Sequence, residues 1–134
     1  MTDRATEKLF VYGSLKEGFP LHAVIEGHEY IGTFKTAPQF KLVSLGPFPA
    51  LVPARPGIEV SGEVYLVDEE TLHYLDIVEG VSKGLYHRIV LPVHDQLGDE
   101  VQAWAYVSLL AQRYVLEEIE SGVWDLTRLE SVVR

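Results

Sequence analysis

The first stretch with chemical potential is residues 9–18, where an apolar run ends abruptly at a glycine. Residues 9–12 are of types that suit a buried strand. Gly13 permits backbone angles closed to other residues and lets a ligand approach closely. Turned inward, the N–H groups of Gly13, Ser14 and Leu15 would form a concavity that binds an anion or a carbonyl oxygen. The alternative is an ordinary turn between a strand and a loop.

The second chemical group is the carboxylate of Glu79, at the end of a helix predicted over residues 68–79. Leu72, Leu75, Asp76 and Glu79 share one helix face, and the two leucines must face the core. Burial, the negative end of the helix dipole and the like charge of Asp76 should all raise the pKa of Glu79. A general base that works near neutral pH needs such a pKa. The alternative is a frayed last turn with a solvated glutamate.

Other motifs are set aside. Residues 13–18 lack the order of a phosphate-binding loop. Ser14 lacks the glycine setting of a nucleophilic serine, so we expect it to donate or accept hydrogen bonds in the loop. We expect no metal site, because no histidine pair has ligand spacing; the histidines are His22, His28, His73, His87 and His94.

The elements that must position these groups follow from the hydrophobic pattern. Asp68 is a good N-cap and Gly80 a natural stop for the predicted helix. Strands are predicted at residues 9–12, 30–36, 40–43, 60–67, 86–94 and 100–107, the last two as an antiparallel hairpin, with a short edge strand at 50–53. We expect a short helix at 21–27, and a partly helical segment over 109–134 that breaks near residues 121–122. This pattern predicts an α+β fold whose mostly antiparallel strands can close into a small barrel.

Composition narrows the class of protein. The chain has 134 residues, which favours a single domain over 1–134, with 1–8 as a flexible arm and 109–134 as a C-terminal extension. It has no cysteine and a net charge of −9, which argues against disulfides and nucleic-acid binding. No signal peptide or membrane-spanning run is visible, so we expect a cytoplasmic protein that acts without a membrane. Oligomeric state cannot be read from the sequence.

Four motifs in order along residues 9–107 resemble the γ-glutamylcyclotransferase-like family, which includes γ-glutamylamine cyclotransferase and the AIG2-like proteins. They are Tyr12-Gly13-Ser14-Leu15, Gly62-Glu63-Val64-Tyr65, Leu75-Asp76-Ile77-Val78-Glu79-Gly80 and Leu85-Tyr86-His87-Arg88. The resemblance implies a small mixed, mostly antiparallel β-barrel flanked by a few helices. It also implies an acyltransferase that releases 5-oxoproline and an amine from a small-molecule γ-glutamyl amide, without a cofactor or metal.

The resemblance also assigns roles. Tyr12, Gly13, Ser14 and Leu15 would hold the γ-glutamyl group, largely through backbone groups, and Glu79 would be the catalytic acid and base. We expect Tyr86 to contact the substrate; with Arg88 it shares a strand face, and the alternative is that both pair with acidic neighbours. The residues support the chemistry independently, because the substrate's own α-amine attacks its γ-carbonyl and no protein nucleophile is needed.

The sequence departs from the family's pattern at two points: Leu21 precedes His22 where relatives often carry asparagine, and Val78 precedes Glu79 where many carry phenylalanine. These changes bear on which amine is released. The net charge favours a cationic amine through long-range attraction. Trp124 either closes over the pocket or packs in the core. Two rival functions stay open: a non-catalytic protein of the same fold that binds a small metabolite, and an interaction module whose pocket is filled by side chains.

Overall fold

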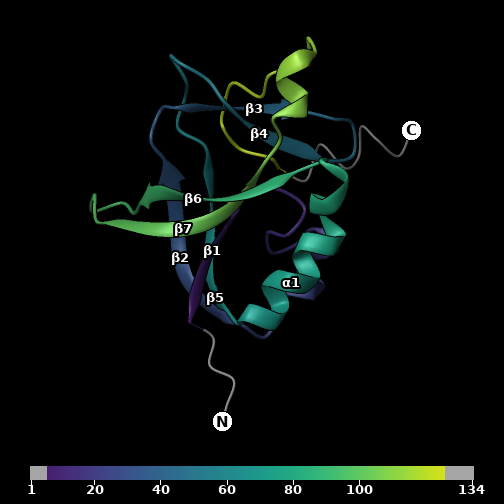
Figure 1. Cartoon of the computed structure of the whole chain (residues 1–134). Helices are drawn as coiled ribbons and strands as arrows, with labels where there is room; N and C mark the ends of the chain where they lie inside the picture. The colour runs from purple at the N-terminus through teal and green to yellow at the C-terminus, as the bar shows by residue number, and fades with distance from the viewer. Residues whose placement is uncertain (1–5, 126–134) are drawn as a thin grey trace.

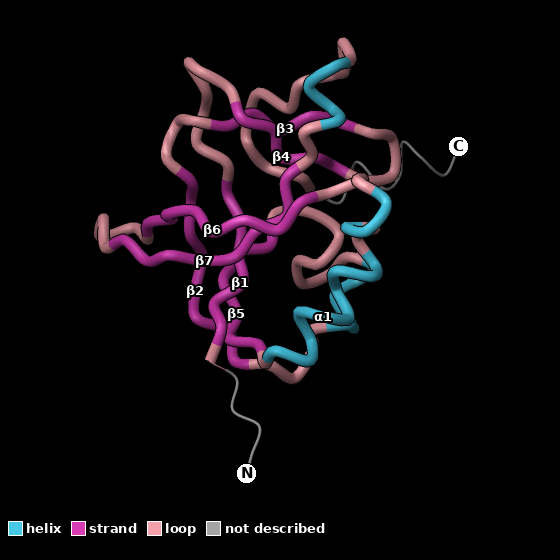
Figure 2. Tube along the Cα trace, viewed as in Figure 1, coloured by secondary structure: helices cyan, strands magenta, loops and turns pink. Residues whose placement is uncertain are grey.

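The computed structural model describes residues 6–125 (Figures 1 and 2). In this range the chain forms seven strands, one α-helix and three short 3-10 helices, in the order β1 (Glu7–Val11), η1 (Pro20–Val24), β2 (Glu29–Thr36), β3 (Phe40–Ser44), β4 (Pro49–Pro53), β5 (Ser61–Val67), α1 (Glu69–Val78), η2 (Val81–Lys83), β6 (His87–His94), β7 (Glu100–Val107) and η3 (Leu110–Arg113). No helix within this range is long and apolar enough to cross a bilayer.

Five strands close into a mixed barrel. The strand order is β1-β5-β2-β6-β7, with antiparallel pairing between successive strands, and β1 closes the ring by a parallel pairing of Leu9 with Trp104 of β7. The β3–β4 hairpin extends the sheet beyond β7, where Leu51 pairs with Val107. The predicted α+β fold with a small mixed, mostly antiparallel barrel is confirmed.

Strand β1 divides the core by the period of two that a strand imposes. Phe10 belongs to the cluster inside the barrel, together with Phe34 and Trp124. Leu9 and Val11 point to the opposite face, where they form a second cluster with Leu72 and Leu75 of α1. Figure 1 shows α1 on one side of the barrel. Strand β1 is therefore held by hydrophobic contacts on both of its faces. The loop that begins at Tyr12 follows directly from this fixed strand.

Helix α1 forms where the sequence predicts it. The Oδ1 atom of Asp68 accepts a hydrogen bond from the N–H of Thr71 at 2.7 Å, which caps the first turn. Gly80 ends the helix in the left-handed region with φ of +66°. Between these signals Leu72 and Leu75 are buried, as their spacing predicts.

One local prediction, the edge strand at 50–53, is wrong. Strand β4 lies between β7 and β3, so β3 is the edge strand. This is possible because the prolines stand at the two ends of β4, while the carbonyl of Leu51 at its centre accepts a hydrogen bond from the N–H of Ser108, just after β7, at 3.0 Å. The short helix expected at 21–27 is present as the 3-10 helix η1, and the helical part expected within 109–134 is present in the described range as the 3-10 helix η3.

The chain ends also differ from the expectation. The predicted flexible arm over 1–8 is wrong for Glu7 and Lys8, because β1 begins at Glu7. Residues 1–5 of that arm lie outside the described residues. In the C-terminal segment, the N–H of Ile119 donates to the carbonyl of Leu42 at 2.7 Å, so this segment packs as extended chain against β3. Residues 126–134 lie outside the described range.

Candidate active site

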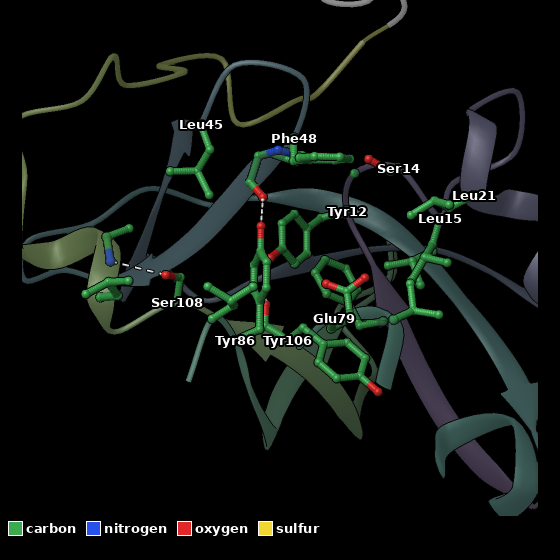
Figure 3. A pocket seen from close by; sticks show the side chains of 18 of the residues that line it. Tyr12, Ser14, Leu15, Leu21, Leu45, Phe48, Glu79, Tyr86, Tyr106 and Ser108 are labelled. Atoms are coloured by element: carbon green, nitrogen blue, oxygen red, sulfur yellow. Dashed lines mark hydrogen bonds between the residues drawn. The ribbon is translucent and has the colours of Figure 1, made fainter. Parts of the chain in front are cut away.

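A cavity of about 520 Å³ opens where the end of β1, the end of α1, the β3–β4 loop and η3 meet (Figure 3). This volume is in the range of sites that hold small molecules. The lining residues are Phe10, Val11, Tyr12, Gly13, Ser14, Leu15, Leu21, Leu45, Phe48, Pro49, Val78, Glu79, Leu85, Tyr86, Tyr106, Ser108, Leu110, Ala111 and Tyr114.

All six residues that the sequence analysis proposed for the site line this one cavity; they are Tyr12, Gly13, Ser14, Leu15, Glu79 and Tyr86. They come from segments up to 74 positions apart in the sequence, between Tyr12 and Tyr86. A cavity at this place is the feature that an interaction module with a filled pocket would lack. The geometry therefore favours the enzyme and the metabolite-binding protein over the interaction module.

Glu79 is the cap residue of α1, where its N–H donates to the carbonyl of Leu75 at 2.8 Å. Its carboxylate points into the cavity in Figure 3. Burial raises the pKa of Glu79 to about 7, as expected from its place on the inner helix face. Among residues 6–125 the carboxylate has no hydrogen-bond donor or cation as a partner, so it is available to a ligand.

Asp76 does not raise the pKa of Glu79 as the sequence analysis expected. Its carboxylate is bound by Arg88, at 2.7 Å from Nε and 3.0 Å from Nη2, and by the hydroxyl of Tyr106 at 2.8 Å. Partial burial alone would raise the pKa of Asp76, but these hydrogen bonds hold it below its usual value. The charge of Asp76 is therefore compensated by Arg88. This pairing also takes Arg88 out of the cavity lining.

The loop after β1 is fixed by its carbonyl groups. The carbonyl oxygens of Gly13, Ser14 and Leu15 accept hydrogen bonds from the N–H of Lys16 at 2.9 Å, the N–H of Leu21 at 3.0 Å and Nδ1 of His22 at 2.9 Å. The N–H groups of the same three residues donate to no acceptor in the described part of the chain. Three fixed peptide units with unused N–H groups beside a cavity are the geometry of an oxyanion or carboxylate site.

Gly13 owes its place to close packing rather than to unusual backbone angles. A Cβ atom there would overlap Cγ of Pro49 and lie 2.9 Å from its Cδ, whereas Gly13 is absent from the glycines with positive φ. The sequence analysis gave the backbone angles as one reason for this glycine, and that reason is wrong. The first residue of β4 therefore packs against the 13–15 loop at this point and sets its position.

The tyrosine hydroxyls at the cavity are already used by the protein. The hydroxyl of Tyr12 donates to the carbonyl of Tyr106 at 2.6 Å and accepts from the N–H of Leu51 at 3.1 Å. The hydroxyl of Tyr86 donates to the carbonyl of Pro49 at 2.7 Å (Figure 3). Burial raises the pKa values of both phenols, so both stay neutral. The two tyrosine hydroxyls therefore connect the strands around the cavity, and a ligand can contact the two aromatic rings.

Several lining residues were missed by the sequence analysis. Leu45, Phe48 and Tyr114 come from segments without a period of two or 3.6, which carry no signal for an inward face. Tyr106 was predicted to be core rather than site, and it is both, because it is buried and lines the cavity. Trp124 is fully buried inside the barrel, which decides between the two expectations in favour of packing.

The donor set does not suit a metal ion. Glu79 is the single carboxylate among the lining residues, and no histidine lines the cavity. Elsewhere in residues 6–125, no group of three or more histidine, aspartate or glutamate side chains could hold a metal. The chemistry that the cavity can do is therefore proton transfer at Glu79 and stabilisation of negative charge by N–H groups.

Comparisons with known proteins show which sequences this chain is similar to. The family model described as "Gamma-glutamyl cyclotransferase, AIG2-like" matches residues 9–126. A Vibrio cholerae protein named "Putative gamma-glutamylcyclotransferase" is 44% identical over 116 residues, which is 87% of this chain and 93% of that protein. The gamma-glutamylaminecyclotransferase of Mus musculus is 34% identical over 116 residues, covering 75% of this chain and 76% of that protein.

Solved structures show the same fold. The crystal structure of an AIG2-like protein from Mus musculus matches with a TM-score of 0.68 and 34% identity, over 76% of each chain. YkqA from Bacillus subtilis matches with a TM-score of 0.76 over 99% of this chain and 44% of that longer protein. Its identity of 24% supports the fold alone.

Proposed function

Because this chain belongs to the gamma-glutamyl cyclotransferase, AIG2-like family, we propose that it cyclises a γ-glutamyl amide to 5-oxoproline and releases an amine. The observation that carries the proposal is the convergence of Glu79 and the free N–H groups of residues 13–15 on one cavity. Glu79 is a proton carrier with a pKa of about 7. The N–H groups can donate hydrogen bonds to the oxyanion that develops during the reaction.

The reaction is an internal acyl transfer. The substrate's α-amine attacks its own γ-carbonyl carbon, a C–N bond forms within the five-membered ring, and the bond to the leaving amine breaks. Two protons move from the attacking nitrogen to the leaving nitrogen. Glu79, as a carboxylate, takes a proton from the α-ammonium group before the attack and gives it to the leaving amine, and it then relays the second proton, which the ring nitrogen loses, to the same amine. The protons balance when the α-ammonium of the substrate is replaced by the ammonium of the released amine, so no co-reactant is needed.

The neutral cavity wall fits the two charges of the γ-glutamyl group. Glu79 supplies the negative partner for the α-ammonium, and no lysine, arginine or histidine lines the cavity to compete for it. The α-carboxylate and the oxyanion are then left to neutral donors, which are the N–H groups of the 13–15 loop and the hydroxyl of Ser14. Folding the γ-glutamyl chain so that its ends meet supplies much of the rate enhancement.

Release of 5-oxoproline from a panel of γ-glutamyl amides tests the proposal, with Glu79→Gln beside the parent and Glu69→Gln as a control. The first substitution keeps the shape and removes the proton carrier, so kcat should fall by about 10²-fold or more. Glu69 is exposed in the first turn of α1, and its variant should keep the parent's rate. For the parent, kcat/KM should fall about tenfold per pH unit below about pH 7.

Two results would contradict the proposal. Undiminished turnover by Glu79→Gln would remove Glu79 from the mechanism. Binding of γ-glutamyl compounds or 5-oxoproline without turnover of any amide would instead support the metabolite-binding protein of the same fold.

A further inference from the structure

The cavity has two chemically different ends. In Figure 3, Glu79 lies near Leu15 and the loop that follows Tyr12, while Leu45 and Ser108 lie at the opposite end. The first end holds the groups assigned above to the γ-glutamyl moiety. A γ-glutamyl amide seated there must direct its amine substituent toward the second end, since the amide nitrogen is at the far end of the γ-glutamyl chain.

An apolar collar surrounds the mouth of the cavity, from the second end to the residues beside Glu79, and is built from large side chains that are 38 to 62% exposed. They come from the β3–β4 loop, the end of α1, the residues before β6, and η3 with its following residue, so four separate segments contribute. The collar consists of Leu45, Phe48, Val78, Leu85, Leu110 and Tyr114. Large apolar side chains that converge on the mouth of a cavity mark a place where an apolar group is bound.

The collar offers no partner for a charge. The lining residues include no lysine, arginine, histidine or aspartate, and their single carboxylate is Glu79, which the α-ammonium group uses. Ser108, at the end of the cavity opposite Glu79, is buried, and its hydroxyl oxygen accepts a hydrogen bond from the N–H of Ala111 at 3.1 Å. An ammonium or carboxylate carried by the amine substituent would therefore lose part of its hydration without gaining a charged partner.

From this we propose that the amine released carries an apolar substituent with no charge of its own, and that Leu45, Phe48, Leu110 and Tyr114 select this substituent. The substrates are γ-glutamyl amides of aliphatic or aromatic primary amines, rather than of diamines, lysine or other amino acids. This inference rests on the proposed function for the direction in which the substrate lies. The net charge of −9 led to the expectation of a cationic amine, and this inference replaces that expectation. Glu79 is the single charged side chain among the lining residues, so the net charge is carried elsewhere on the protein.

The first test compares kcat/KM for matched γ-glutamyl amides. Propyl, butyl, pentyl and phenethyl amides form the apolar series, and the amides of putrescine and of leucine carry a positive and a negative charge. Each added methylene should raise kcat/KM by about fourfold until the collar is filled. The charged amides should be turned over about 10- to 100-fold less efficiently than the apolar amides of similar size.

A second test measures binding without chemistry. Monoamides of glutaric acid lack the α-amine and cannot cyclise, so their dissociation constants can be measured by calorimetry with the same amines. The phenethyl and pentyl monoamides should bind about tenfold or more tightly than the putrescine monoamide. This preference is expected whether or not the parent turns over any amide, so failure of the proposed function and failure of this inference give different results.

Charge placed in the collar should reverse the preference. Leu110→Asp should lower kcat/KM for the phenethyl amide by about tenfold or more and raise it for the putrescine amide. Leu97→Asp is the matched control, because Leu97 is 87% exposed in the β6–β7 turn and does not line the cavity. Equal or better turnover and binding of the charged compounds by the parent, or an unchanged preference in Leu110→Asp, would overturn the inference.

Discussion

At the scale of single residues, the contact between Gly13 and Pro49 sets the loop that faces Glu79. A methyl group at Gly13 would overlap the Pro49 ring, which cannot swing away as a flexible side chain would. Gly13→Ala should therefore displace the N–H groups of the loop and lower kcat/KM by about 10²-fold. Its stability cost should be about 1–3 kcal/mol, the usual cost of overpacking.

A double variant separates position from chemistry. Pro49→Ala removes the ring that the new methyl group meets, so combining it with Gly13→Ala should restore part of the lost kcat/KM. Thermal unfolding shows in parallel that each variant is folded. Parent-like kcat/KM for Gly13→Ala alone would mean that the loop's exact position is irrelevant to turnover.

Residue types revealed much of the candidate site in the sequence. Glu79 could be assigned to an inner face because two leucines fix the orientation of its helix, and the loop at residues 13–15 because a glycine ends a buried strand. The partners of these residues could not be read. That Pro49 confines Gly13, and that Tyr12 uses its hydroxyl on strands β4 and β7, are contacts between distant segments that leave no local pattern.

At the scale of elements, Asp76 ties the end of α1 to strands β6 and β7. It lies one turn before Glu79, where it is bound by Arg88 and Tyr106, and the Arg88 guanidinium also stacks on Trp104 at 4.3 Å. These contacts join the helix that carries Glu79 to the barrel wall. We therefore regard Asp76 as a positioning residue rather than a catalytic one.

Asp76→Asn should loosen this connection. It leaves Arg88 without its carboxylate, which should destabilise the fold by about 1–3 kcal/mol. It should also lower kcat more than it changes KM, because Glu79 is held less well. The cation left unpaired beside the helix end should move the acid limb of the kcat/KM profile to lower pH.

The pH profile of kcat/KM distinguishes a role of Asp76 in positioning Glu79 from a role in stabilising the fold alone. Glu69→Gln on the same helix, in its exposed first turn, should leave both the profile and kcat at parent values. A loss of stability in Asp76→Asn with an unchanged profile and kcat would show that the contact supports only the fold.

Elements with a strong period were readable from the sequence, and those without one were not. Helix α1 and the β6–β7 hairpin have clear periodicity and boundary residues, and both appear close to their expected limits. The collar segments around Leu45 and Tyr114 have neither feature. Their inward-facing side chains are set by how β4 and η3 pack on the barrel, which is a tertiary effect.

At the scale of the whole molecule, closure of the barrel is what creates the cavity. The parallel pairing of β1 with β7 joins segments 95 positions apart, at Leu9 and Trp104, and brings the loop after β1 opposite the end of α1. A mixed barrel was predicted from the number of short strands, but its strand order was not, since long-range pairing has no local signal. The half-buried position of Glu79 follows from this closure.

That burial makes the stability of the protein depend on pH through Glu79. Its folded pKa of about 7 lies above its ordinary value of 4.5, so the folded state binds the proton more tightly than the unfolded state does. The stabilisation is fully present below pH 4.5 and is lost as the pH rises through about 7. Glu79→Gln removes this titration.

Compared with the parent, Glu79→Gln should therefore gain stability as pH rises. The difference in unfolding free energy between variant and parent should increase between pH 4.5 and pH 8, by on the order of 2 kcal/mol, or a few degrees in Tm. Urea unfolding at four or five pH values measures it, and groups common to both proteins cancel in the difference. Glu100→Gln, at an exposed glutamate in the β6–β7 hairpin, should show no such trend. A difference that stays constant from pH 4.5 to pH 8 would mean that Glu79 titrates as a solvated carboxylate, and the cavity would then lack the proton carrier that the proposed reaction needs.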